Sequence, residues 1–490
     1  MVKRDLCRVL GKGLGQAVAL ELFQSVVWHL AAKGWAIEQV VDELARHPNG
    51  IGRKYADRLH DEVTRSYEKW RQQKYTAATG SAAPITPRCS IPEMEWSQQA
   101  LILTGIVATP FLRPDGSICE QPGYDAASGM LFKPDDQDFP PIPQAPSKED
   151  ACTALKQLNS LIDTFPFVSK LDRSVALSGI LSALDRRSMV TAPLHALTAP
   201  VAGSGKSLLV DIISMIATGQ IAPVIAQGRK DEEMDKRLET ALMSGDSIIS
   251  IDNCERPLES STLCQALTQQ RMKIRILGES RHTEVLVNAL ICATGNNLVV
   301  AGDLTRRTLL CSLDAGCERP ELRSFNTDVI ETIRTHRGRL VVAALTILRA
   351  WHIARAKERL SLSPFGSFEQ WSRRVREPLV WLDCADPCET VPLVRDSDPG
   401  REALVLVVMQ WEKNLGLDRP HTVQQIIGLA VSDIDFHAAL SAVAAHRGGL
   451  LSNHRLGRWL NRVKGKIVNG LKLIHQGNVH GYPLWTLTKQ

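Results

Sequence analysis

The nine residues from Ala199 to Ser207, Ala-Pro-Val-Ala-Gly-Ser-Gly-Lys-Ser, constrain the fold of this chain more than any other segment. An apolar run, Met189–Leu197, precedes them, and a second apolar run follows. A strand, a loop of small residues, a Lys-Ser pair and a helix, in this order, can surround a phosphate with backbone N–H groups. Pro200 replaces the first glycine of the usual pattern, but Gly203 and Gly205 remain nearest the phosphates. The sequence therefore predicts an α/β fold with a phosphate-binding loop.

We expect this loop to bind ATP. The N-terminus of the following helix carries partial positive charge, Lys206 can reach the β- and γ-phosphates, and Ser207 can ligate Mg²⁺. The residues expected to contact the nucleotide are Ala202, Gly203, Ser204, Gly205, Lys206, Ser207 and Leu208. A chance Gly/Ser loop before a helix is the alternative, so the neighbouring motifs decide.

A second short apolar strand, Ser247–Asn253, delivers an acid. A buried strand of this kind places Asp252 beside the loop, where it can hold Mg²⁺ together with Ser207. Asn253 follows at the position where many ATPases have the glutamate that polarises the attacking water. The water-activating group is therefore left open between Glu232, Glu233 and Glu255.

A third apolar strand, Val285–Ala293, leads into a pair of amides and then a pair of arginines. Asn296 or Asn297 can orient water against the γ-phosphate. Arg306 or Arg307 can reach the nucleotide of a neighbouring subunit and stabilise transition-state charge in trans. Each motif alone is weak, because strand-terminal acids are often caps and arginine pairs are often solvated. The four motifs in this order predict an ATPase.

Charge is unevenly distributed along the chain. The net charge is +5 over 490 residues, but the segment after Asp435 holds eight Lys and Arg residues and no Asp or Glu. A basic C-terminal part indicates nucleic-acid binding.

The sequence shows neither a signal peptide nor an apolar run of membrane-spanning length. Its eleven cysteines are scattered without zinc-ligand spacing. We expect a cytoplasmic protein that does not bind membranes.

Periodicity and composition divide the chain into segments. They are a helical region at 1–76, a linker at 77–95, a small mixed strand and helix region at 96–187, an ATPase core at 188–320, a helical segment at 321–395 and a C-terminal domain at 400–490.

A hairpin is predicted inside the core, just before the third strand. Met272–Leu277 alternates as a strand, Gly278–Thr283 is a polar turn, and Glu284–Thr294 is the return strand. In a ring, such hairpins would line the central channel, where cations follow a phosphate backbone. The expected DNA contacts here are Lys273, Arg275, Arg281 and His282. An ordinary sheet extension with solvated charges is the alternative.

The C-terminal domain is predicted to be a winged helix. A helix over Leu451–Lys466 begins after the capping residue Ser452, and strands at Ile467–Ile474 and Tyr482–Leu487 flank a turn at 476–478. Arg455, Arg458, Arg462 and Lys466 recur at steps of three and four and make one basic face. We expect DNA contacts from Arg455, Arg458, Arg462, Lys464 and Lys466. A solvated basic helix packed on the ATPase is the alternative.

Together these motifs resemble the helicase half of phage- and plasmid-type primase–helicases, the D5-like branch of superfamily 3 within the AAA+ class. The core resemblance rests on Ala199–Ser207, Ile248–Asn253, Cys292–Asn297 and Gly302–Arg307. Outside the core, Gly123–Phe132, Glu377–Pro387 and Arg455–Leu487 are similar to the corresponding flanking regions, and the segment around Tyr55–Arg58 to the helices that follow a primase module.

The resemblance implies an ATP- and Mg²⁺-dependent DNA helicase. It would act as a homo-hexamer on single-stranded and duplex DNA, in replication of a phage, plasmid or integrated mobile element. The sequence has neither the catalytic carboxylates nor the zinc ribbon of a primase, so a separate primase or polymerase is expected as a partner. The alternative is an origin-binding replication initiator that uses ATP as an assembly switch, which Asn253 mildly favours.

Overall fold

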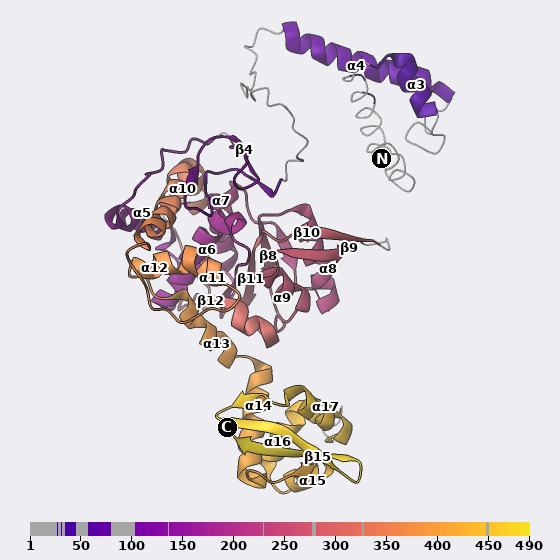
Figure 1. Ribbon diagram of the computed structural model, residues 1–490, viewed down its shortest axis with the longest axis vertical. Coiled ribbons are helices and arrows are strands. Elements are labelled where there is room, and N and C mark those ends of the chain that lie inside the picture. Colours follow the sequence, from indigo (N-terminus) through magenta and orange to yellow (C-terminus); the bar gives the residue numbers. More distant parts are fainter. Residues whose placement is uncertain are drawn as a thin grey trace. The chain divides into compact units, whose positions relative to one another are not determined.

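The computed structural model describes residues 103–490, apart from 136, 229, 277–280, 326–327 and 447–449, together with residues 27, 31, 35–45 and 57–79. Its contacts separate Met1–Trp96 from Ser97–Gln490, and each unit is described by itself. The larger unit holds a parallel five-stranded sheet among many helices (Figure 1). The predicted mixed α/β class is therefore confirmed at this level.

The described part of the smaller unit consists of helices α3 (Ile37–Ala45) and α4 (Leu59–Thr79). Val40, Leu44 and Val63 are buried between them. Helices were predicted for both stretches, and α4 extends past residue 77, where the linker was expected to begin. The part of the predicted helical region that precedes residue 35 lies, apart from residues 27 and 31, outside the described residues.

The larger unit begins with short strands, as the Pro-, Gly- and Asp-rich composition predicted. One small sheet has the order β1 (Gly105–Val107), β5 (Met130–Phe132), β4 (Gly123–Asp125). Strands β2 (Phe111–Leu112) and β3 (Ile118–Cys119) form a second pair.

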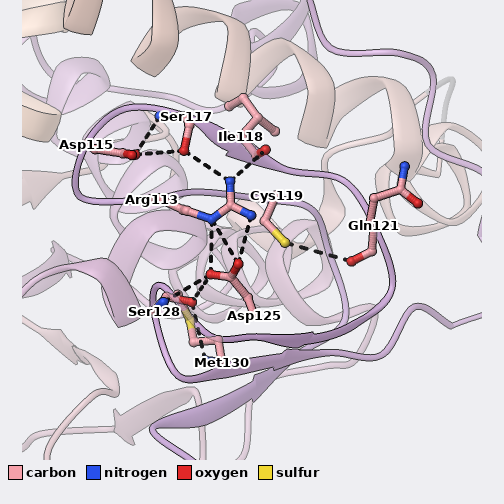
Figure 2. A network of polar contacts seen from close by, with 9 residues as sticks. All are labelled: Arg113, Asp115, Ser117, Ile118, Cys119, Gln121, Asp125, Ser128 and Met130. Carbon is pink, nitrogen blue, oxygen red and sulfur yellow. Dashed lines mark hydrogen bonds and ion pairs between the residues drawn. The ribbon is translucent and has the colours of Figure 1, made fainter. Parts of the chain in front are cut away.

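One polar network joins these strands (Figure 2). The guanidinium of Arg113 donates from Nη2 to Asp125 Oδ1 at 2.8 Å and from Nη1 to Ser117 Oγ at 3.0 Å. Ser128 Oγ donates to the other oxygen of Asp125 at 2.5 Å. The hydrogen bond from Arg113 is the main cause that lowers the pKa of Asp125. Asp125 therefore acts here as a structural anion that ties two hairpins together.

The central sheet has the strand order β12-β6-β11-β8-β7, and every neighbouring pair is parallel. Its strands are β6 (Leu194–Ala199), β7 (Val224–Ala226), β8 (Ile248–Asp252), β11 (Leu290–Asn296) and β12 (Thr308–Ser312). The inner strands are almost wholly buried, as expected for a parallel sheet covered on both faces. The carboxyl ends of β6, β8 and β11 consequently meet at one edge.

Helices surround the sheet and share its hydrophobic core. They are α5 (Lys148–Ile162), α6 (Lys170–Asp185), α7 (Lys206–Thr218), α8 (Asp231–Ser244), α9 (Ser261–Thr268), α10 (Val329–Ala354), α11 (Glu369–Trp371), α12 (Glu377–Trp381) and α13 (Thr390–Asp396). The long α10 packs against α5 and α7. A buried ion pair, Arg374–Asp185 at 2.5 Å, joins the segment after α11 to α6.

The predicted hairpin is present, but the expected return strand is wrong. Strand β9 (Arg271–Arg275) pairs antiparallel with β10 (His282–Leu286), and the chain then breaks at residues 287–289 before entering the central sheet as β11. At this break the carbonyl oxygens of Val287 and Ala289 accept hydrogen bonds from Arg186. Residues 278–280, half of the predicted turn, lie outside the described residues. Figure 1 shows the hairpin projecting from the body of this unit.

The last part of the chain has its own hydrophobic core, which includes Trp411, Phe436, Leu460 and Trp485. Its helices are α14 (Pro399–Leu415), α15 (Val423–Ala430), α16 (Ile434–Ala444) and α17 (Asn453–Val463). An antiparallel sheet has the order β13 (His421–Thr422), β16 (Tyr482–Lys489), β15 (Leu471–Val479), β14 (Ile467–Val468).

Two details of this part correct the sequence analysis. The long hairpin turns at His480 and Gly481, both at positive φ, whereas the predicted turn at 476–478 falls at a register irregularity inside the ladder. Such a turn with two left-handed residues matches the twist of the strands. Helix α17 ends at Val463, so Lys466 does not belong to the basic face of the helix. Within the described residues, none of the helices has both the length and the apolar character needed to cross a membrane.

Candidate functional site

The loop between β6 and α7 requires glycine at two positions. Gly203 and Gly205 have φ values of 76° and 97°, in the left-handed region. A Cβ at Gly203 would lie 3.0 Å from the backbone nitrogen of Glu321, and a Cβ at Gly205 would lie 3.0 Å from the ring of Phe165. Pro200 precedes both glycines. The loop therefore turns tightly and opens directly into the N-terminus of α7, where free N–H groups favour an anion.

Lys206, the first residue of α7, reaches across to the end of β11. Its Nζ donates to Asn296 Oδ1 at 2.8 Å and to the carbonyl oxygen of Val201 at 3.2 Å. Burial lowers the pKa of Lys206, and the charge of Asp252 opposes that shift. The loop thus holds an ammonium group directly beside the carboxyl ends of two strands.

Ser207 and Asp252 also meet at this edge. Ser207 Oγ donates to Asp252 Oδ1 at 3.1 Å, and the hydroxyl of Thr294 makes a short hydrogen bond to the same carboxylate oxygen. A hydroxyl and a carboxylate beside the loop between β6 and α7 are the hard oxygen ligands that Mg²⁺ prefers. This donor set fits Mg²⁺ completed by water and phosphate oxygens. Thr294 was quoted in the sequence analysis only as part of a motif, without a role.

The two remaining amides lie differently. Asn297 has a φ of 47° and donates its backbone N–H to the carbonyl oxygen of Ala199 at 2.9 Å, while no hydrogen bond joins its side chain to a described residue. Asn253, at φ 53°, donates from Nδ2 to Glu255 Oε1 at 3.1 Å. Of the two candidate amides after β11, the structure therefore brings Asn296 to Lys206, and Asn297 contributes through its backbone.

Arg306 and Arg307 lie at the opposite edge of the sheet from the loop. They end a short 3₁₀ helix immediately before β12, whose first residue, Thr308, pairs with Leu194 at the start of β6. The loop follows the other end of β6, and five residue steps of a strand span roughly 16 Å. Neither arginine can reach the loop of its own chain.

The two arginines differ in their surroundings. Arg306 has a side chain 51% exposed, and among the described residues it pairs only with Asp303, at 2.5 Å. Arg307 is 12% exposed, pairs with Asp303 at 2.8 Å and donates to the carbonyl oxygen of Cys264 at 2.9 Å. Arg306 is therefore available for an external contact, whereas Arg307 is held in place within the chain.

A cavity of about 230 Å³ adjoins the loop, lined by Gly203, Gly205, Phe165, Arg323 and Phe325 among others. Arg323 stacks over Phe325, with its guanidinium 5.0 Å from the ring centre, and donates to the carbonyl oxygen of Thr164 at 3.0 Å. Phe165, Arg323 and Phe325 were missed by the sequence analysis. They lie far from the loop in sequence, and no local pattern marks them.

The hairpin presents cations on one face. Lys273 and Arg275 are exposed, while Met272 and Ile274, which alternate with them along the strand, are buried, as the alternation of a strand requires. Arg281 and His282, at the start of β10, are exposed as well. Arg271, the other cation of this face, pairs with Glu284 at 2.6 Å, which leaves the positive charge concentrated toward the turn.

Helix α17 presents the second basic surface. Ser452 caps it by accepting the N–H of Arg455 at 3.3 Å. The buried residues Leu456, Leu460 and Val463 fix the helix on the domain core. The predicted DNA-contacting residues Arg455, Arg458, Arg462, Lys464 and Lys466 are all exposed, the last two beyond the helix. A groove of about 380 Å³ runs beside the helix and is lined by Arg458, Asn461, His454, Gln424 and Tyr482 among others.

Among solved structures, the chain is similar to three of the C-terminal region of NrS-1, all without ligand. Sequence identity is 12–13% and the TM-score is 0.35–0.36, with 73–74% of this chain and 79–80% of those chains covered. No protein-family model matches the chain, and no curated protein matches it.

Proposed function

We propose that this protein is an ATP-dependent DNA motor of the AAA+ class that assembles into a ring. In this proposal the ring is a hexameric helicase that acts in replication. The observation that carries the proposal is the meeting of three strand ends around Lys206. Its ammonium group lies 2.8 Å from Asn296, and the neighbouring Ser207 lies 3.1 Å from Asp252. An ammonium, two metal ligands and a water-orienting amide are the groups that hydrolysis of Mg·ATP needs.

In this proposal the residues divide the chemistry between them. The N–H groups of the loop and Lys206 bind the β- and γ-phosphates, where the positive charge stabilises the charge that develops in the transition state. Ser207 and Asp252 would hold Mg²⁺, which would supply positive charge to stabilise the phosphate oxygens. Thr294 orients the carboxylate of Asp252, and Asn296 positions the attacking water once Lys206 has turned to the phosphate. Phe165 and Phe325 offer apolar faces to the base of the nucleotide.

Assembly follows from the position of the arginines. Because Arg306 lies at the far edge of the sheet from its own loop, it can complete a nucleotide site only on a second copy of this chain. Arrangements in which one edge of a subunit meets the opposite edge of the next are heterologous, and they form a ring when the rotation between neighbours closes. Six copies are proposed on the strength of the sequence resemblance alone.

The two basic surfaces suggest the substrate. The β9–β10 hairpin would contact a single strand through Lys273 and Arg275, and the four-helix and sheet unit at the C-terminus would bind duplex DNA through α17 in the manner of a winged helix. Both surfaces are exposed and basic on one face. A separate primase or polymerase is proposed as the replication partner.

A strand-displacement assay on forked DNA tests the proposal. The wild-type chain should unwind the fork only with hydrolysable ATP and Mg²⁺, and Lys206→Ala should lose both unwinding and ATP hydrolysis while keeping its melting temperature. The control is Lys156→Gln, which changes an exposed lysine on α5. Unwinding by the Lys206→Ala protein would contradict the site, and ATP hydrolysis without any unwinding would contradict the helicase.

One observation favours a second candidate, an origin-binding initiator that uses ATP as an assembly switch. Asn253 replaces the usual glutamate beside Asp252, and its amide engages Glu255 at 3.1 Å. Slow hydrolysis would suit a switch. Sequence-specific, ATP-dependent duplex binding without strand displacement would favour the initiator.

A further inference from the structure

A small cavity with uncompensated positive charge lies at the edge of the sheet opposite the phosphate-binding loop. Its volume is about 170 Å³. Among the residues that line it are Thr109, Lys133, Arg186, Arg187, Thr218 and Asn288. The lining contains three cationic side chains and no Asp or Glu. Thr218 ends α7 and Lys206 begins it, so about 18 Å of helix separates this cavity from the loop.

Arg186 supplies a fixed charge beneath the cavity. It is 2% exposed and donates to three backbone carbonyls, those of Val287, Met189 and Ala289. Burial and the neighbouring charge of Arg187 lower its pKa to about 10, so it remains charged at neutral pH. Each of its three nitrogens donates to a carbonyl oxygen, and no carboxylate of a described residue pairs with its charge.

Arg187 lines the cavity, and most of its N–H donors have no acceptor among the described residues. Its guanidinium makes one hydrogen bond within that part of the chain, from Nη2 to Ser247 Oγ at 2.9 Å. Burial lowers the pKa of Arg187, and no carboxylate opposes that shift. A Cβ at Gly105 would overlap Arg187 Nη1, so the glycine leaves room for the guanidinium.

Two further groups of the lining, Thr109 and Lys133, can contact an anion in the cavity. Thr109 is 3% exposed, and no described residue hydrogen-bonds its hydroxyl. Lys133, at the rim, is exposed. Helices α6 and α7 end at this edge, and the partial negative charge of two helix C-termini offsets only part of two full positive charges. Burying like charges without an anion is costly, so an anion would be stabilised here.

We propose that this cavity is a second, separate binding site for a phosphate group, held by Arg187, Thr109 and Lys133 over the buried charge of Arg186. Guanidinium groups and hydroxyls are the donors that phosphate oxygens accept. The volume admits orthophosphate or the terminal phosphate of a nucleotide. A bound phosphate would also tie the base of the β9–β10 hairpin, at residues 287–289, to the end of α7, because Asn288 and Thr218 line the same cavity.

Equilibrium dialysis of radiolabelled orthophosphate against the full chain tests the proposal. The Lys206→Ala background removes binding at the loop, and chloride keeps the ionic strength constant. We expect saturable binding of one phosphate per chain. Arg187→Gln should weaken it at least about tenfold, since a charge-assisted hydrogen bond is lost, and Lys133→Gln and Thr109→Val should weaken it about threefold. Arg334→Gln, an exposed arginine on α10, is the matched control and should bind as the parent does.

The site is overturned if phosphate does not bind saturably, or if Arg187→Gln and Lys133→Gln both bind like the control. Should Arg187→Gln fail to fold, the exposed Lys133 still decides the result. Hydrogen exchange on phosphate addition should slow at residues 104–109 and 287–289; protection confined to other segments would refute the location. Competition by ADP identifies the ligand as the terminal phosphate of a nucleotide, and its absence identifies free orthophosphate; either supports the phosphate chemistry.

Discussion

The contrast between Arg306 and Arg307 yields the sharpest prediction. Replacing Arg306 with alanine removes an ion pair with Asp303 whose partners are both about half exposed, at 51% and 53%. Exposed pairs of this kind contribute about 1 kcal/mol or less to the free energy of unfolding. If Arg306 instead stabilises transition-state charge in a neighbouring site, its loss should lower kcat by a factor of about 10³ or more, equivalent to about 4 kcal/mol in activation free energy.

Arg307→Ala should behave differently. This side chain is 12% exposed and makes charged hydrogen bonds to Asp303 and to the Cys264 carbonyl. Loss of such buried, charge-assisted bonds costs about 2 to 3 kcal/mol of unfolding free energy. We therefore expect Arg307→Ala to melt earlier and Arg306→Ala to melt with the wild type. Arg334→Ala is the matched control, because Arg334 is 58% exposed and pairs with Glu331 three residues away.

The assay combines steady-state ATP hydrolysis, nucleotide binding and thermal denaturation. Action in trans makes one further demand. A mixture of equal amounts of Lys206→Ala and Arg306→Ala should regain activity, since about a quarter of randomly assembled head-to-tail interfaces would join an intact Lys206 to an intact Arg306. If Arg306→Ala hydrolyses ATP at the wild-type rate, or if the mixture stays as inactive as its components, the assignment of Arg306 is refuted.

Three other predictions follow from the site, the C-terminal basic surface and the core. Phe325→Ala should weaken nucleotide binding, measured by titration calorimetry, about tenfold, and should leave the thermal stability nearly unchanged. Unchanged affinity would contradict the proposal that the base of the nucleotide binds in this cavity. Arg458→Gln should reduce the dependence of log K for duplex binding on log salt by about 1, measured by fluorescence anisotropy, and Arg401→Gln should leave it unaltered. His195 is buried with a pKa lowered from 6.5 to about 4. Because the unfolded chain takes up this proton first as the pH falls, the free energy of unfolding should drop between pH 6.5 and 4 by about 3 kcal/mol, and His195→Gln should lack that component. An equal fall in the free energy of unfolding for His195→Gln and the wild type would contradict this contribution of His195.

The local motifs were readable from the sequence because they depend on backbone geometry over a few residues. A strand followed by Gly203, Gly205 and Lys206 predicts a loop in which left-handed glycines precede a helix, and both glycines have positive φ. The alternation of Met272–Leu277 predicted a strand, and the structure has strand β9 at Arg271–Arg275. Ser452 predicted the start of α17. Each of these signals is complete within its own segment.

Errors arose where a distant contact decides a local outcome. Apolar residues run on from Val285 into β11, so periodicity indicated one return strand. In the structure β10 ends at Leu286 and β11 begins at Leu290, and between them the carbonyl oxygens of Val287 and Ala289 accept hydrogen bonds from the distant Arg186. Lys466 continues the spacing of the basic face, but α17 ends at Val463. A period of three and four residues has meaning only while the helix lasts.

The sequence by itself determined the order of the chemical groups: a glycine-containing loop that ends in Lys-Ser, an acid after a buried strand, two amides and two arginines. Only the tertiary structure decided which members of these pairs lie close to Lys206. The insertion of β11 between β6 and β8 brings Asn296 to Lys206, while parallel pairing of β12 with β6 sends Arg306 and Arg307 to the opposite edge. The spacing of residues along the chain does not predict these positions, because strand order and side-chain burial arise from packing between segments far apart in sequence.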